Sequence, residues 1–205
     1  MRKLLHIDSS IQTDRSVSRQ LSDAIVKRLK DSEHPLEVIY RDLAADPLPH
    51  LSAAVFASFS GQDEASSRSR DQRDDVTESA KVLEEFLSAD IVVIGVAFYN
   101  YSIPSSLKAW IDRIVVANRT FSYGGGAAPV GLAGDKRVVV AVARGGIFTE
   151  GTSNAQREHA VRYLRDIFEL VGVCNIEVVA AEGLAYGPEA SAKAVEGALN
   201  EIAAM

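Results

Sequence analysis

The residues best suited to chemistry in this chain form the segment Phe98-Tyr99-Asn100-Tyr101. The segment follows a continuous apolar run at 91–97 and leads into a helix-like run that starts at Ser105. Aromatic rings, one amide side chain and backbone N–H groups suit a flat, partly polar heteroaromatic ligand, and the segment contains no obvious nucleophile. Because ligands of open α/β sheets bind just beyond the carboxyl ends of parallel strands, the segment predicts a site that holds a cofactor.

A serine-rich turn from Asp8 to Ser18 contains the second group of candidate residues. Ser16 or Ser18 suits the N-cap of the helix that follows. The free N–H groups and the dipole of a helix N-terminus both favour an anion, so a phosphomonoester would fit there, with Ser10, Ser16 and Ser18 as further donors. Taken alone, the turn is better explained as an ordinary serine-rich cap; together with the aromatic segment, it favours a phosphate site.

The segment Ala143-Arg144-Gly145-Gly146 forms the third group, again directly after an apolar run. Two glycines allow the backbone to come close to a ligand, and their N–H groups would bond ring oxygens and nitrogens. The alternative is a tight turn that needs glycine for its backbone angles. The segment by itself does not decide between the two.

Alternating strand and helix patterns must position these three groups. Short runs predict strands at 3–8, 36–42, 91–97, 137–143 and 176–181, and the central ones are nearly uniformly apolar, as expected for strands buried on both faces. Helical patterns lie between and after them, at 18–30, 71–88, 105–116, 154–171 and 188–204. The alternation predicts an α/β, flavodoxin-like, doubly wound five-stranded parallel sheet of order 2-1-3-4-5. The three groups would then be neighbours and would contact the phosphate, the ring edge and the ring face of one ligand, FMN.

We expect residues 1–205 to form a single FMN-binding domain with a long excursion at about 46–70. The excursion contains Pro47, Pro49 and several serines, and a short helix is expected at 51–59. Loops of this length are uncommon unless they are functional or disordered. A surface insertion, and a lid or subunit contact, both remain open.

Composition excludes several other classes of protein. A net charge of -6 and a pI near 5.3 argue against a nucleic-acid surface. There is no apolar run of 18 residues, so we expect no membrane span and take the cytoplasm as the compartment. The four histidines show no metal-ligand spacing, so no metal is expected. The single cysteine, Cys174, is expected to be a small buried hydrophobe.

Several segments in a fixed order carry a family resemblance over essentially the whole chain. They are Ser9-Ser10 with Ser16-Val17-Ser18, Arg41-Asp42-Leu43-Ala44, Phe98-Tyr99-Asn100-Tyr101, Leu107-Lys108-Ala109-Trp110-Ile111-Asp112, Thr120-Phe121-Ser122-Tyr123, Arg144-Gly145-Gly146 and Ala181-Glu182-Gly183-Leu184-Ala185-Tyr186-Gly187-Pro188. With these segments the chain resembles the FMN-dependent NADH:quinone oxidoreductases known as azoreductases.

The resemblance implies specific roles. Phosphate contacts would come from Ser10, Ser16, Val17 and Ser18, and isoalloxazine contacts from Phe98, Tyr99, Asn100, Tyr101, Ala143, Arg144, Gly145 and Gly146. It also implies a homodimer with each active site at the subunit interface. NADH or NADPH would reduce FMN, which would then reduce a quinone or azo compound by a ping-pong mechanism. The flavin would carry the chemistry, without a catalytic side chain.

Three questions stay open at this point. The candidate walls of the substrate pocket are Phe121, Tyr123 and Phe168, but each fits plain core packing equally well. The choice between NADH and NADPH is also open, because Arg15, Arg119 or Arg144 would suit the 2′-phosphate of NADPH. Besides the oxidoreductase, a flavodoxin-type electron carrier and a flavin-free scaffold protein on the same fold are alternatives. A carrier would need an acidic patch around the flavin, whereas the predicted site carries arginines.

Overall fold

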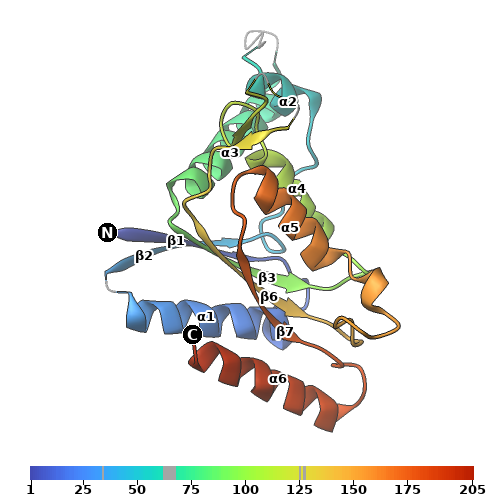
Figure 1. Ribbon diagram of the computed structural model, residues 1–205. Helices are drawn as coiled ribbons and strands as arrows, with labels where there is room; N and C mark the ends of the chain where they lie inside the picture. The colour runs from blue at the N-terminus through green and yellow to red at the C-terminus, as the bar shows by residue number, and fades with distance from the viewer. Residues whose placement is uncertain (34, 62–67, 125, 127) are drawn as a thin grey trace.

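A five-stranded parallel sheet forms the centre of the computed structural model, which describes residues 1–33, 35–61, 68–124, 126 and 128–205 (Figure 1). Its strands are β1 (Arg2–Asp8), β2 (Leu36–Asp42), β3 (Ile91–Ala97), β6 (Arg137–Ala143) and β7 (Ile176–Ala181). Their order across the sheet is β2-β1-β3-β6-β7, and every neighbouring pair is parallel. The five predicted strand ranges agree with these bounds, apart from one residue at the start of β1.

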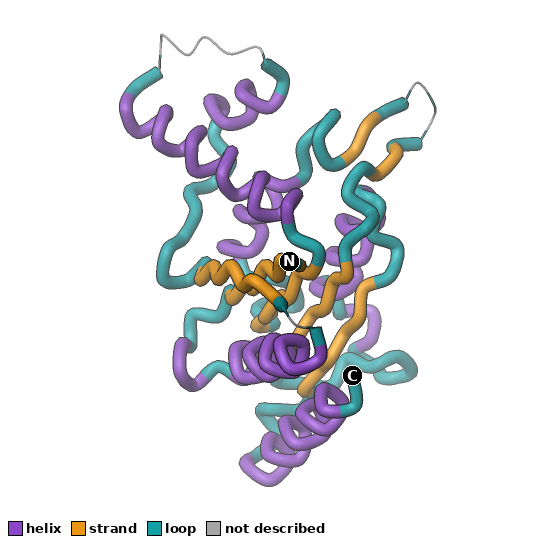
Figure 2. Tube along the Cα trace, turned by 90° about the vertical axis from the view of Figure 1, so that its left-hand side faces the viewer, coloured by secondary structure: helices purple, strands orange, loops and turns teal. Residues whose placement is uncertain are grey.

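The strand numbers differ from the predicted order 2-1-3-4-5 because two short strands precede β6. These strands, β4 (Phe121–Ser122) and β5 (Val130–Gly131), pair antiparallel in a separate two-stranded sheet (Figure 2). A side chain at Gly131 would overlap the backbone of Gly172, which follows helix α5 (Ala160–Leu170). A glycine therefore lets this small hairpin pack against the end of a helix distant in sequence.

Helices cover both faces of the sheet, as Figures 1 and 2 show. On one face lie α1 (Val17–Ser32) and α6 (Pro188–Ala203); on the other lie α3 (Arg70–Ser88), α4 (Ser105–Ile114) and α5. Each of these helices buries an apolar stripe, as expected for a helix that covers a sheet. Pro188 occupies the first turn of α6, where its missing N–H costs no hydrogen bond.

Helix α5 starts later than the pattern at 154–171 predicted. A 3₁₀ turn, η3 (Ala155–Arg157), comes first. The Glu158 carboxylate then accepts the backbone N–H groups of Ala160 and Val161 at 3.1 and 3.0 Å. Because these first N–H groups of a helix have no partner within it, the carboxylate stabilises a start at Ala160.

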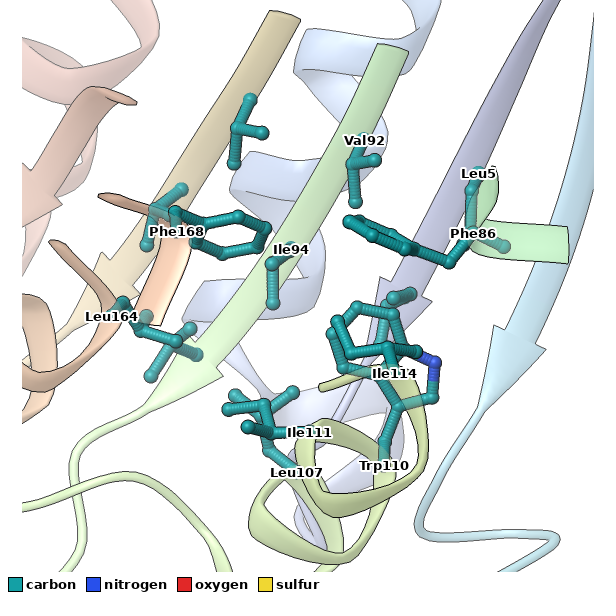
Figure 3. Close-up of a cluster of buried hydrophobic side chains, with 14 of the residues drawn as sticks. Leu5, Phe86, Val92, Ile94, Leu107, Trp110, Ile111, Ile114, Leu164 and Phe168 are labelled. Carbon is teal, nitrogen blue, oxygen red and sulfur yellow. The ribbon is translucent and has the colours of Figure 1, made fainter. Parts of the chain in front are cut away.

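The larger core lies between the sheet and helices α3, α4 and α5 (Figure 3). Phe86 is at its centre, with its ring 6.0 Å from that of Trp110 and 6.4 Å from that of Phe168. All three side chains are fully buried. Burial of each contributes on the order of 2–3 kcal/mol. This core fixes β3 and β6, whose ends form the site.

The excursion is tied to α3 and α4 at its beginning. Its helix α2 (Ala53–Phe59) starts two residues later than predicted, because Ser52 is the N-cap and accepts the Val55 N–H at 3.3 Å. Ser52 also donates to Asp75 on α3 at 3.1 Å. Asp75 in turn pairs at 2.8 Å with the fully buried Arg113 of α4. Residues 62–67 of the excursion lie outside the described residues.

The expectation of a buried Cys174 is wrong, because the structure places this residue at the surface. It stands in the turn between α5 and β7, where Val171 and Val173 point into the core and take up the apolar part of the segment. Within the described part of the chain, no helix has both the length and the apolar character needed to cross a membrane.

Candidate cofactor site

A cavity of about 350 Å³ opens at the carboxyl ends of β1, β3 and β6. Its lining residues are Ser10, Gln12, Ser16, Val17, Ser18, Ala97, Phe98, Tyr99, Ala143, Gly145, Leu184, Ala185 and Ser191. Eight of the twelve predicted cofactor-binding residues are among them. The other four, Asn100, Tyr101, Arg144 and Gly146, lie on the same loops but do not line this cavity.

The phosphate candidates surround the start of α1. The Ser16 Oγ accepts the Arg19 N–H at 3.4 Å and lies 3.1 Å from the Ser18 Oγ. The Ser16 carbonyl accepts the Gln20 N–H at 3.1 Å. Within the described residues, the N–H groups of Val17 and Ser18 are then left without a partner. Two free N–H groups and buried hydroxyls at the positive end of a helix form a suitable site for a phosphate.

Side-chain hydrogen bonds from Arg19 hold the serine-rich turn in place. Its Nε and Nη2 donate to the Ser10 carbonyl at 3.2 and 2.8 Å. Its two Nη atoms also donate to the Asp42 carboxylate at 2.6 and 2.7 Å. The hydrogen bonds from Arg19 are the main cause that lowers the pKa of Asp42 to about 2. The turn is thus connected to the end of β2 by a bidentate ion pair.

Gly95 allows α1 to approach the sheet closely enough to reach this position. A methyl group at Gly95 would overlap Asp8 Oδ1 and lie 3.0 Å from the Ser22 Oγ and 3.2 Å from the Ser18 carbonyl oxygen. The buried Asp8 carboxylate accepts the hydroxyls of Ser22 and Tyr40 at 2.8 and 3.1 Å. The glycine therefore makes room for a buried carboxylate between α1 and β3.

The aromatic segment after β3 forms a tight turn. Tyr99 and Ser102 exchange backbone hydrogen bonds of 3.0 and 2.9 Å, and the residues between them have positive φ, 49° for Asn100 and 70° for Tyr101. Such a pair of angles is typical of a type I′ turn. Asparagine tolerates them, but tyrosine rarely adopts them, and backbone strain of this kind concentrates at ligand sites. The Tyr99 hydroxyl also lies 3.3 Å from the Ser10 Oγ, which connects this turn to the phosphate region.

The loop after β6 presents free backbone donors. The carbonyl groups of residues 144–146 accept N–H groups from residues 183–185 at 2.9 to 3.2 Å. In contrast, the N–H groups of Gly145, Gly146 and Ile147 donate to no acceptor in the described part of the chain. Free donors next to the Phe98 ring fit the edge of a heteroaromatic ring that carries oxygen and nitrogen acceptors. The residues present therefore fit FMN.

The Arg144 side chain is already paired. It contacts Glu158 and Glu182 at 3.1 and 2.7 Å, and its guanidinium carbon lies 5.6 Å from the centre of the Phe98 ring. Its Nε is buried without a partner among the described residues. With two carboxylates bound, Arg144 is unsuited to the 2′-phosphate contact that the sequence left open.

Three aromatic rings lie together beside the cavity. The rings of Phe98 and Phe148 are 4.7 Å apart, and the Tyr101 ring lies 6.4 and 6.1 Å from them. The sequence had not assigned a role to Phe148. A larger cavity of about 730 Å³ lies next to this region and is lined by both Tyr99 and Asn100. Asn100 thus faces a space that is adjacent to the phosphate cavity rather than part of it.

The three substrate-pocket candidates are not brought together. Phe168 is 0% exposed in the core next to Leu164 and Phe86, so its prediction as a pocket wall is wrong (Figure 3). Phe121 is nearly buried, and Tyr123 is 67% exposed with its ring 5.3 Å from that of Phe121. Neither lines the two cavities described above, and their role stays a prediction.

Sequence reasoning missed five residues of the cavity, Gln12, Ala97, Leu184, Ala185 and Ser191. Ser191 comes from the first turn of α6, and no pattern near it in the sequence pointed to a ligand. Among the described residues, no group of three or more histidine, cysteine, aspartate or glutamate side chains could hold a metal ion.

Comparison with known proteins places the chain first by fold and then by family. Residues 2–205 match a family model described as having a flavodoxin-like fold. An FMN-dependent NADH:quinone oxidoreductase from Methylorubrum extorquens (strain PA1) is 52% identical over 204 residues, which cover 99% of this chain and 98% of that protein. One from Xanthomonas campestris is 50% identical over 203 residues, with the same coverage. The chain belongs to this family of FMN-dependent NADH:quinone oxidoreductases.

Solved structures agree with this assignment. An azoreductase from Bacillus anthracis superposes with a TM-score of 0.86 at 31% identity, covering 100% of this chain and 98% of the other. An FMN-dependent NADH-azoreductase from the same species, solved in complex with FMN, gives a TM-score of 0.85 at 26% identity, with 99% of each chain covered.

Proposed function

We propose that this protein is an FMN-dependent oxidoreductase that uses NADH or NADPH to reduce quinones and azo compounds. The observation that carries the proposal is a set of backbone N–H groups without a partner in the described part of the chain, at Val17 and Ser18 and at residues 145–147, on the two loops that flank the turn after β3. Ser18 is buried, and because buried N–H groups are nearly always paired, its free donor indicates a ligand at the start of α1. Gly145 and Ile147 are exposed, so their free donors are accessible to acceptors of the same ligand. Membership of the family supports FMN as that ligand.

Each loop has a separate task in the proposed mechanism. The start of α1, with Ser10, Ser16 and Ser18, binds the phosphate. The donors of residues 145–147 bind the ring edge and stabilise negative charge on it. FMN held there would supply the redox chemistry, which is acceptance of a hydride from the nicotinamide and delivery of a hydride equivalent to the second substrate. Use of one ring face by the nicotinamide and the acceptor in turn would give ping-pong kinetics.

Side chains contribute to position and to the exclusion of water rather than to proton transfer. Phe98, Tyr101 and Phe148 form an apolar aromatic surface next to the donors. No nucleophile or general base is assigned to this surface. An apolar surface that leaves one ring face accessible suits flat substrates such as quinones and azo dyes.

Assembly and organisation follow from the same proposal. We expect a homodimer with each active site at the subunit interface, and one FMN-binding domain over residues 1–205 with the 46–70 excursion as part of it. Use of a nicotinamide as electron donor supports the cytoplasm as the compartment.

The first test removes two of the three serine hydroxyls that are proposed to bind the phosphate, with the double substitution Ser16→Ala, Ser18→Ala. Hydrogen bonds to a charged group contribute about 1.5–3 kcal/mol each, so FMN affinity should fall at least tenfold. Quenching of FMN fluorescence on titration with the protein measures this affinity. Ser88→Ala serves as the control, because Ser88 ends α3 and its hydroxyl donates, among the residues that the structure describes, to the Glu85 carbonyl alone. Equal affinity in the double variant and the control would refute the phosphate site.

The second test concerns activity. The FMN-loaded protein is mixed with NADH without oxygen, and a quinone is added afterwards. Loss of the visible flavin absorbance, followed by its recovery with quinone, is expected for the oxidoreductase. A bound flavin that NADH fails to bleach would instead indicate the electron carrier.

A further inference from the structure

A buried cluster of three charges lies directly behind the loop after β6. The Arg144 guanidinium contacts Glu158 Oε1 at 3.1 Å and Glu182 Oε1 at 2.7 Å. The exposed fractions of the three side chains are only 7%, 11% and 13%. Water therefore screens these charges weakly, and their fields extend to neighbouring groups.

The two carboxylates are each held by further donors. Glu158 accepts the first N–H groups of α5, and Glu182 accepts the Phe148 N–H at 2.9 Å and the Thr149 hydroxyl. Burial alone would raise the pKa of Glu182, but the hydrogen bonds from Thr149, Arg144 and Phe148 outweigh it and keep the pKa below its usual value. With one cation and two anions, the cluster carries a net charge of -1.

The cluster lies at the ring end of the proposed cofactor site. Its guanidinium carbon is 5.6 Å from the centre of the Phe98 ring, and Phe98 lines the cofactor cavity. Glu182 accepts the backbone N–H of Phe148, and the Phe148 ring packs on that of Phe98 with 4.7 Å between the ring centres. The free donors of residues 145–147 stand between Arg144 and Phe148 in the chain. A charge in this cluster is therefore close to a ring bound on these loops.

We propose that the cluster of Arg144, Glu158 and Glu182 lowers the reduction potential of the bound flavin. The inference rests on the proposed function, because it requires the flavin ring to lie on residues 98–101 and 145–147. Uptake of a hydride brings two electrons and one proton, and so adds one negative charge to the ring. A cluster with a net charge of -1 opposes that charge, which favours onward transfer of the electrons to the acceptor.

The structure also explains why the positive charge of Arg144 does not raise the reduction potential of the flavin. An unpaired guanidinium near the ring would stabilise the added charge and raise the potential. Here both Nη groups are bound to carboxylates, so the cation is more than compensated. The uncharged donors of residues 145–147 are left to hold the ring edge. The backbone N–H groups thus position the flavin ring, and the net negative charge of the cluster lowers its reduction potential.

The test is Glu182→Gln in the FMN-loaded protein. Glutamine keeps the size and one oxygen acceptor but removes the charge, so the two-electron potential should rise by about 30 mV, a tenfold change in the equilibrium constant. Reductive titration against a reference dye measures the potential without any turnover. The matched control is Glu177→Gln, which removes an equivalent arginine partner, bound at 2.7 and 2.9 Å to Arg137, from the opposite end of β7. Glu177 is roughly 16 Å from Glu182 along the strand, so its variant should keep the original potential.

Glu158→Gln provides a second variant, because it removes a charge from the other side of Arg144 and should also raise the potential. If Glu182→Gln does not fold, Glu158→Gln alone decides. Flavin-loaded variants that keep the original potential would overturn the inference. So would folded variants that no longer bind FMN, because the cluster would then hold the cofactor and not set its potential. Failure of the unaltered protein to bind FMN would instead contradict the proposed function.

Discussion

Replacement of Gly95 by alanine tests the close packing that positions the phosphate site. Gly95 lies in β3, beneath the first turns of α1. The added methyl group would overlap Asp8 Oδ1, which is buried and receives the Ser22 hydroxyl at 2.8 Å. Because the Ser18 carbonyl oxygen and the Ser22 Oγ are also within 3.2 Å of the new methyl group, the carboxylate has little room to move aside.

The expected loss of stability follows from two costs and one gain. Overpacking of a well-filled site costs about 1–3 kcal/mol. Displacement of Asp8 from Ser22 weakens a charged hydrogen bond, which costs a further ~1.5–3 kcal/mol. Loss of glycine's extra freedom in the unfolded chain returns about 0.5–1 kcal/mol. The free energy of unfolding should therefore fall by about 2–5 kcal/mol, which at this chain length lowers the melting temperature by at least about 4 °C.

Urea unfolding of the protein freed of FMN, followed by circular dichroism, measures this change without a contribution from ligand binding. Gly197→Ala is the matched control. Gly197 lies in α6, and a methyl group there would have no atom within 4 Å, so alanine should stabilise the helix by about 0.5–1 kcal/mol. The reasoning fails if Gly95→Ala is as stable as the unaltered protein to within about 0.5 kcal/mol, the range usual for surface substitutions that disturb nothing.

Further predictions concern the turn after β3, the serine-rich turn and the wall formed by α6. Asn100→Gly introduces a residue that tolerates a φ of 49°, so the free energy of unfolding should change by no more than about 1 kcal/mol while FMN affinity falls. Unchanged affinity in a fluorescence titration would show that the Asn100 side chain does not contact the flavin ring. The pKa of Asp42, about 2 when folded against about 3.9 when unfolded, means that its ion pair stabilises the protein fully above about pH 5 and is lost as the pH falls towards 2. Asp42→Asn should flatten that part of the melting temperature profile, and an unaltered slope would contradict the assignment. Ser191→Ala should weaken FMN binding about threefold to tenfold without loss of stability, as one neutral hydrogen bond would; calorimetric titration with FMN checks it.

The sheet was predictable because its signals are local. Four of the five strands agree with their predicted bounds, and β1 starts one residue early. The signal is strongest in the central strands β3 and β6, which are buried almost throughout and apolar along nearly their whole length. The β4–β5 hairpin was not predictable in this way. Its strands have two residues each, and the close approach of Gly131 to Gly172 that packs it joins segments far apart in the chain.

The candidate site was predictable where a loop follows a strand, and less so elsewhere. Phe168 was misplaced although a signal existed: it follows Ala160 and Leu164 at intervals of four, which is the spacing of a buried helix face. Ser191 carries no comparable signal, because the packing of α6 against β7 and α1 brings it to the cavity.

The free donors after β6 show why motifs alone cannot define such a site. Two glycines in sequence indicate only that the backbone is able to approach a ligand. Their N–H groups are available because residues 183–185 take up the carbonyl groups on the other side of the loop, and because Glu182 holds Arg144 and the Phe148 N–H at once. The segment after β7 therefore determines what the segment after β6 presents. A substitution at Glu182 should thus alter the flavin environment, although the sequence assigned no chemistry to this residue.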